Sequence, residues 1–486
     1  MIDVKRILVG CALFVGIIIP GFLSCVSALA SYDETSPPAL PGSEGEGEQT
    51  QEAVEPQPVD IWAILAKVME LLEAGDYDGA LGCFDEVDPI IAESSRALIL
   101  KASILSSAGR LGESRTIIEG VISQEPRNTD ALLVLATIEG AVGKEREQRA
   151  ILERILTVDP AKVEALISLG TIALRDRSLR AAASYFDRAL AAEPENGDAL
   201  VGKALVFWYN QDPQNAEALL NKAITLYPQW AVPLSERARI YRNTGYFKYA
   251  LADMDAAKEL NPGNYWIAID RGNVLLDLKK KREALEEFNR AIQLDPNNFL
   301  AYVYSAGIKD DFKDYDGAEQ DYIILARLRP DYYFGFEGVG MHHMRKGRWA
   351  EARDAFLEAY KQAPQETTYA LLAAMNWMRA GKITDPKPLL EQAMRQAPRD
   401  SVEWPILRLY RDLSGDSDMA ARVEKETNLE VKARMLYYLA NYYDIRKNKT
   451  LANSYFVQVK DLNQQHIVEW RLNEWVLEER NLGGTW

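Results

Sequence analysis

Residues 265–298 read YWIAIDRGNVLLDLKKKREALEEFNRAIQLDPNN, two amphipathic segments joined by a basic turn and followed by a proline. A proline recurs in the same register, every 34 residues, at Pro126, Pro160, Pro194, Pro228, Pro262, Pro296, Pro330, Pro364 and Pro398. Proline cannot continue a helical hydrogen-bond ladder, so it should end each second segment. This period predicts one helical hairpin per repeat.

Small residues recur at fixed places within the period. With position 1 set three residues after each proline, position 8 is occupied by Ala102, Ala136, Gly170, Ala204, Ala238, Gly272, Ala306, Gly340 and Ala374. Position 24 carries the large residues Phe84, Phe186, Leu220, Met254, Phe288, Tyr322, Phe356 and Leu390. Glycine inside a helix costs about 1 kcal/mol relative to alanine, so the glycines at position 8 indicate that neighbouring helices must approach closely.

Together with small residues at positions 20 and 27, this pattern resembles the tetratricopeptide repeat family. The resemblance implies an all-α fold, a right-handed superhelical solenoid of about twelve helix-turn-helix repeats with a C-terminal capping helix. The repeat array should cover residues 61–463, with units starting near 61, 95, 129, 163, 197, 231, 265, 299, 333, 367, 401 and 433. Residues 464–486, with Trp470 and Trp475, should form the capping helix and tail.

Two units depart from the pattern. Pro386 replaces the alanine of position 20, so we expect its helix to start late, with Asp385 as the cap. Arg408 and Glu424 break positions 8 and 24 of the eleventh unit, where we expect a bend or an interruption.

The N-terminus is typical of an export signal, with Lys5 and Arg6 followed by an apolar run to residue 30. Three alternatives remain open. Residues 22–25 resemble a lipobox in which Cys25 is lipidated, cleavage after Ala30 fits an ordinary signal peptidase, and the uncleaved run is barely long enough to be an anchor. Each alternative places the repeats outside the cytoplasmic membrane, and two of them attach the chain to a membrane through its N-terminus.

Residues 31–60 are rich in proline, glycine and glutamate and contain few large apolar side chains. Such a segment cannot bury enough surface to offset the entropy of ordering it. We expect a disordered acidic linker that acts as a spacer. This segment also carries much of the excess of acidic over basic residues that gives the chain its net charge of −16. The mildly acidic repeats argue against a duplex nucleic-acid partner, which requires a basic face.

The sequence shows none of the catalytic motifs that we sought. No stretch of domain length lies outside the array, and no nucleotide-binding loop or zinc-protease motif occurs. The three histidines, His342, His343 and His466, are expected to have structural or surface roles. Cys83 is the one cysteine beyond the signal and is expected to be buried. We therefore predict a non-enzyme without metal or cofactor.

The family resemblance implies that first helices line a concave groove through positions 2, 5, 9, 12 and 13. In the central units these positions include Trp208, Tyr209, Arg239, Arg242, Trp266, Asn273, Phe334, Glu337, Met341, Met344, Arg345, Met375 and Met378. Aromatic, Met and Arg side chains are enriched at binding surfaces. The alternative is that Trp208 and Trp266 pack against the next repeat.

A second candidate surface is the turn with Lys279, Lys280, Lys281 and Arg282. It is either an anionic-ligand patch or a solvated turn. The favoured function is a membrane-tethered extracytoplasmic scaffold whose groove binds a segment of an envelope protein, for assembly, sorting or secretion. The alternative is a surface adhesin for host or matrix ligands. The partner is in either case a protein or peptide, and the oligomeric state stays open.

Overall fold

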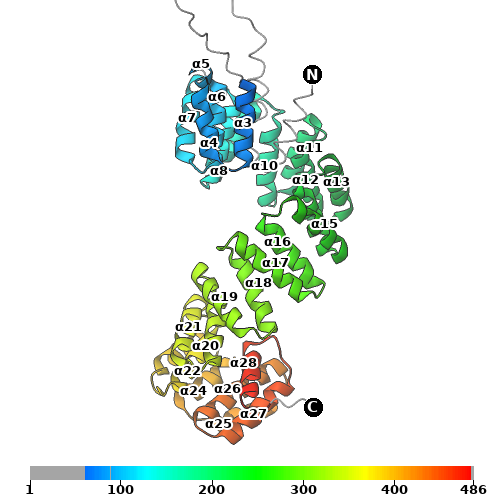
Figure 1. Cartoon of the computed structure of the whole chain (residues 1–486). Helices are drawn as coiled ribbons and strands as arrows, with labels where there is room; N and C mark the ends of the chain where they lie inside the picture. The colour runs from blue at the N-terminus through cyan, green and yellow to red at the C-terminus, as the bar shows by residue number, and fades with distance from the viewer. Residues whose placement is uncertain (1–60, 88, 483–486) are drawn as a thin grey trace, which may run out of the picture. The chain divides into compact units, whose positions relative to one another are not determined.

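The computed structural model describes residues 61–87 and 89–482 (Figure 1). Cys25, Ala30 and the predicted signal and linker lie outside the described residues. Within the described residues the chain is helical and contains no strand. Helices follow one another as antiparallel neighbours stacked in pairs, so the predicted all-α class of helix-turn-helix repeats is confirmed. The handedness of a superhelix stays a prediction.

The chain divides into two compact units that meet between Pro262 and Gly263. In the N-terminal unit the helices are α3 (Ile61–Glu73), α4 (Tyr77–Gly82), the 3-10 helix η2 (Cys83–Glu86), α5 (Pro89–Ala92), α6 (Ser95–Ser107), α7 (Leu111–Gln124), α8 (Thr129–Ala141), α9 (Glu145–Val158), α10 (Val163–Arg175), α11 (Leu179–Ala192), α12 (Gly197–Tyr209), α13 (Pro213–Leu226), α14 (Ala231–Asn243) and α15 (Phe247–Leu260).

In the C-terminal unit the helices are α16 (Tyr265–Asp277), α17 (Lys281–Leu294), α18 (Phe299–Asp311), α19 (Tyr315–Leu328), α20 (Tyr333–Arg345), α21 (Trp349–Gln362), α22 (Thr367–Arg379), α23 (Lys387–Gln396), α24 (Glu403–Asp412), α25 (Asp416–Lys425), α26 (Leu429–Ile445), α27 (Lys449–Asp461) and α28 (Val468–Glu479). The even-numbered helices from α6 to α26 are the first helices of their repeats. Helix α28 follows the last pair.

The recurring prolines end the second helices as predicted. Each lies two residues beyond the helix, as Pro262 does after Leu260 and Pro296 after Leu294. The turn inside each repeat has its own recurring feature, a residue in the left-handed region. Gly245 has φ +84° and Lys279, one repeat later, has φ +63°. Glycine adopts this conformation without strain, whereas lysine has to tolerate it.

Glycine at position 8 makes room for an aromatic ring, as the sequence indicated. A Cβ added to Gly170 would lie 2.8 Å from the Phe186 ring, and one on Gly272 would lie 2.8 Å from Phe288. Both rings come from position 24 of the same repeat and are fully buried. Phe186 also packs on the next repeat, where a Cβ on Gly202 would lie 2.2 Å from it. The close approach therefore holds one repeat against another.

We expect Gly202→Ala to lower the free energy of unfolding of the N-terminal unit by about 1–3 kcal/mol, because the new methyl group overpacks the site of Phe186. Gly120→Ala is the matched control, since Gly120 is exposed within α7 and an added Cβ meets nothing within 4 Å. It should raise stability by about 1 kcal/mol through helix propensity alone. Urea unfolding followed by circular dichroism measures both changes, and equal effects would contradict this packing.

The two departures from the pattern shorten their helices. Helix α23 starts late, at Lys387, as expected. The prediction of Asp385 as its cap is wrong, because Pro386 occupies the N-cap position and no side chain caps the helix. Helices α24 and α25 have ten residues each, with the left-handed residues Leu413 and Gly415 between them. The eleventh unit is thus interrupted by two shortened helices.

Candidate partner-binding site

In the N-terminal unit the predicted groove residues lie on neighbouring first helices, α12 and α14. Tyr209 is 40% exposed, and the Arg177 guanidinium lies over its ring at 4.5 Å. The side chain of Arg239 is 44% exposed and pairs with Glu236 at 2.6 Å. Trp208 and Arg242 are half-buried. This surface presents aromatic and guanidinium groups to solvent.

In the C-terminal unit the predicted groove residues separate into two groups. The side chains of Trp266, Phe334 and Arg345 are exposed, and Glu337 is half-buried. The others lie in the core: Asn273, Met341, Met344, Met375 and Met378. Met375 has no exposed surface because its first helix, α22, is covered on several sides. These five side chains therefore do not line an open groove.

The basic turn is largely engaged with acids of its own chain. Lys280 pairs with Glu283 at 3.0 Å, and Lys281 pairs with Asp311 at 2.6 Å. The Arg282 guanidinium lies 6.0 Å from the centre of the Phe312 ring. These contacts favour the solvated turn over the anionic-ligand patch.

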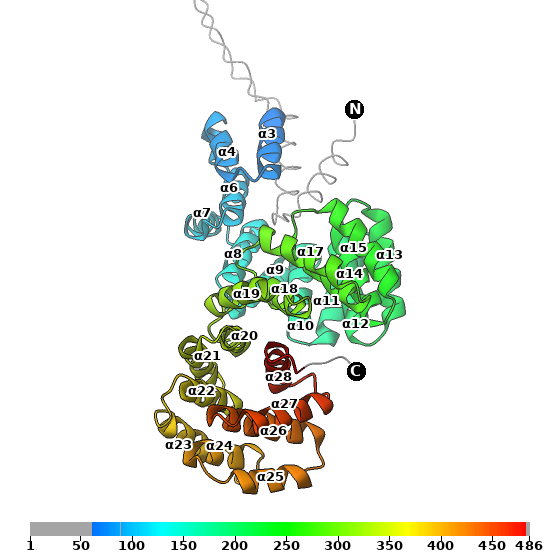
Figure 2. The same cartoon turned by 60° about the horizontal axis from the view of Figure 1, so that its bottom comes forward.

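Helix α28 covers the inner side of the C-terminal unit. It packs against α26 and α27, which directly precede it, and also against α20, more than 120 residues earlier in the chain. Figure 2 shows α28 beside α20, on the inner side of the arc formed by α20 to α27. The helix therefore covers part of the surface of the first helices α20 and α26.

Aromatic and charged contacts hold α28 to the earlier repeats. The Trp475 ring lies edge-on to Tyr315 at 5.4 Å and tilted against His342 at 5.3 Å. The Arg471 guanidinium donates to Asp310 Oδ2 at 3.2 Å, and Lys313 Nζ donates to Glu478 at 2.5 Å. His342 is buried and its Nε2 lies 3.0 Å from the other oxygen of Asp310. The imidazole thus has the structural role predicted from the sequence.

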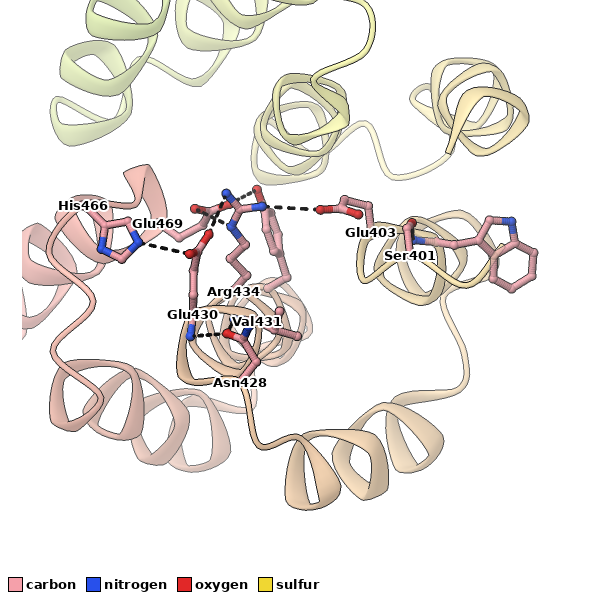
Figure 3. Close-up of polar contacts among 10 residues, drawn as sticks. Ser401, Glu403, Asn428, Glu430, Val431, Arg434, His466 and Glu469 are labelled. Atoms are coloured by element: carbon pink, nitrogen blue, oxygen red, sulfur yellow. Dashed lines mark hydrogen bonds and ion pairs between the residues drawn. The ribbon is translucent and has the colours of Figure 1, made fainter. Parts of the chain in front are cut away.

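A polar network around the buried Glu469 joins α28 to α24 and α26. Arg434 lies among three carboxylates, with N–O distances of 3.4 Å to Glu403, 3.4 Å to Glu430 and 3.9 Å to Glu469 (Figure 3). Tyr438 donates its hydroxyl hydrogen to Glu469 Oε1 at 3.2 Å. Burial lowers the pKa of Arg434, but the surrounding acids more than offset this effect, so the net shift is upward. One guanidinium therefore balances an excess of carboxylates.

Two carboxyl groups in this interior are under-neutralised. Glu469 has no exposed surface, and its Oε2 has no hydrogen-bond partner. Burial raises the pKa of Glu469, and Arg434 offsets only part of that shift. Burial also raises the pKa of Glu337 on α20, although the Tyr369 hydroxyl donates to its Oε2 at 2.5 Å. The negative charge of Glu469 adds to the shift of Glu337.

Two cavities flank this network. One, of about 190 Å³, lies between α18, α19, α20 and α28 and is lined by Tyr322, Tyr332, Phe334, Glu337, Met341 and Arg471 among others. The other, of about 490 Å³, lies at the start of α22 and α24 and includes Glu366, Thr367, Glu403 and Arg434. The described residues contain no group of His, Cys, Asp or Glu arranged to hold a metal ion. Each cavity has charged side chains in its lining, Glu337 and Arg471 in the smaller and Glu366, Glu403 and Arg434 in the larger.

Sequence reasoning missed the polar partners in this interior, namely Tyr369, Glu403, Arg434, Tyr438, Glu469 and Arg471. The two tryptophans of the last helix were the available signal, because they marked a charged helix with large apolar side chains beyond the last repeat. They did not show which earlier helices it would contact. In the described part of the chain, no helix is long and apolar enough to cross a membrane.

Comparisons with known proteins agree with the repeat pattern. Two sequence models of the tetratricopeptide repeat match the chain, one at residues 167–229 and 308–367 and the other at residues 267–298. Small glutamine-rich tetratricopeptide repeat-containing protein 2 of Saccharomyces cerevisiae is 24% identical over 131 residues, 27% of this chain and 37% of the yeast protein. These matches support the tetratricopeptide repeat family, and with it a protein-interaction scaffold of a typically non-enzymatic kind.

Solved structures give weaker likenesses. PilF of Pseudomonas aeruginosa is 22% identical, with a TM-score of 0.39, over 43% of this chain and 96% of PilF. The human IFIT1 dimer, solved with m7Gppp-AAAA, is 17% identical, with a TM-score of 0.44, over 82% of this chain and 90% of that one. With TM-scores below 0.5, neither carries an argument about function.

Proposed function

We propose that the chain is an exported, membrane-tethered scaffold whose N-terminal unit captures a segment of a cell-envelope protein for assembly, sorting or secretion. The observation that carries the capture site is the exposed surface of α12 and α14, with Tyr209 and Arg239 on neighbouring first helices. In the described residues of this unit, every helix from α6 to α15 belongs to a repeat pair, so the unit has no counterpart of α28.

The chemistry of this surface suits an extended or helical protein segment. An aromatic ring beneath a guanidinium, as in Tyr209 and Arg177, offers both apolar area and directed hydrogen-bond donors. Val232, also on α14, is 42% exposed and adds apolar area. Tethering through Cys25 is a separate part of the proposal, supported by the lipobox-like residues and the acidic spacer of the sequence.

We expect the double variant Tyr209→Ala, Arg239→Glu to reduce recovery of the partner at least tenfold, because removing two anchor residues costs about 2 kcal/mol or more. The measurement is mild crosslinking of cells that express the tagged full-length chain, followed by mass spectrometry of captured proteins. The matched control is Tyr249→Ala, Lys248→Glu on the second helix α15, where Tyr249 is 64% exposed. This control should leave recovery unchanged.

The same purified material tests the tether. A lipidated Cys25 at the mature N-terminus supports it, whereas an N-terminus at Ser31 removes it. Unchanged recovery with the double variant, at unchanged helix content, would overturn the capture site. Digestion of the repeats by protease added to intact cells, with no envelope partner captured, would favour the adhesin instead.

A further inference from the structure

The smaller cavity of the C-terminal unit combines aromatic walls with one carboxylate. Tyr332 and Phe334 come from the start of α20, Met341 lies two turns further along, and Glu337 lies between them. Arg471 of α28 completes the lining. At about 190 Å³ the cavity has room for one amino-acid side chain rather than for a large ligand.

The charges around the cavity are unequally matched. Arg471 is held by Asp310, so its positive charge already has a partner. Glu337 accepts a hydrogen bond from the neutral Tyr369 hydroxyl, and no cation of the described residues lies within 4.0 Å of its carboxylate. Burial is the main cause of the raised pKa of Glu337, and the Tyr369 hydroxyl and the more distant charge of Arg471 offset only part of the shift.

We propose that this cavity binds a primary ammonium group on a short alkyl chain, carried by a lysine of a protein partner or by a free alkylamine. The ammonium would pair with Glu337, and the faces of Tyr332 and Phe334 would attract the same charge through their ring quadrupoles. The alkyl chain would lie against Met341. This site is in the C-terminal unit and does not rest on the capture surface proposed for α12 and α14.

The test uses the full-length chain with ¹³C-labelled methionine methyl groups, in which Met341→Leu assigns the Met341 signal. N-acetyl-lysine methylamide is titrated into the chain, and the norleucine analogue, of similar shape but without the charge, serves as the reference probe. We expect a saturable shift of the Met341 methyl signal with the lysine probe alone. Pentylamine is the third probe, since tighter binding of lysine identifies a peptide source and tighter binding of pentylamine identifies a free amine.

Variants assign the binding to the cavity. Glu337→Gln keeps an acceptor for Tyr369 and should weaken binding at least tenfold, whereas Glu351→Gln, which removes an exposed carboxylate of α21, should leave it unchanged. Phe334→Ala provides a second test because Phe334 is 43% exposed, so we expect the fold to tolerate its loss. Equal shifts with the norleucine probe, or full affinity in both Glu337→Gln and Phe334→Ala, would overturn the proposal.

Discussion

Replacing Trp475 with alanine is expected to lower the free energy of unfolding of the C-terminal unit by about 3–5 kcal/mol. The Trp475 side chain is 8% exposed and contacts Tyr315 and His342, so its removal leaves a cavity between α28 and the earlier repeats. Trp266→Ala is the matched control, because that indole is 45% exposed on α16. It should change stability by well under half as much.

Amide hydrogen exchange shows which helices lose stability when Trp475 is replaced. Loss of Trp475 should speed amide exchange in α19 and α20, which α28 covers, and leave the exchange of the N-terminal unit unchanged. If exchange rises only within α26 to α28, the contact of α28 with the earlier repeats contributes little to the stability of α19 and α20. Helix α28 would then act simply as the cap of the last pair, as the sequence predicted.

Replacing Glu469 with glutamine is expected to stabilise the C-terminal unit at neutral pH by about 1 kcal/mol or more, since a buried and under-compensated charge is removed. Glutamine still accepts the hydrogen bond of Tyr438, and Arg434 keeps Glu403 and Glu430. The gain at neutral pH is the opposite of what loss of a favourable ion pair would produce. Thermal unfolding at a series of pH values measures it.

The pH dependence follows from the raised pKa of Glu469. The folded state binds this proton more tightly than the unfolded state, so the contribution of Glu469 to stability is fully present below the ordinary glutamate pKa of 4.5 and is lost as pH rises through the raised value. Glu337, which faces Glu469, contributes in the same direction. Glu469→Gln should flatten this decline and lose its advantage below pH 4.5.

Glu391→Gln, which removes an exposed carboxylate of α23, is the control and should leave the pH profile unchanged. A Glu469→Gln variant that is less stable than the natural chain at pH 7 would contradict the prediction. In that case the pairing of Glu469 with Arg434 would outweigh the cost of burying the carboxylate.

The repeat pattern predicted the local geometry well because each repeat packs mainly on its neighbours. The glycines of position 8 predicted a close approach between helices, and the rings of Phe186 and Phe288 occupy the space beside Gly170 and Gly272. The left-handed turn residues escaped prediction. Lys279 occupies the same backbone conformation as Gly245, and no glycine marked its place.

The side chains predicted to line the groove differ in their exposure to solvent. Tyr209 and Arg239 are exposed as a binding surface requires, whereas Met375 and Met378 lie in the core. Repeat position assigns a side chain to a helix face, but the exposure of that face depends on what packs against it. Helix α22, which carries both methionines, packs against α21, α23, α24 and α26.

The sequence by itself determined the all-α repeat class, the ends of the second helices and the close packing at position 8, because a 34-residue period acts between neighbours in the chain. Only the tertiary structure decided that α28 meets residues more than 120 positions earlier, and that the buried Glu469 acts on the half-buried Glu337. Such contacts depend on the summed curvature of several repeats, which no single repeat encodes in its pattern.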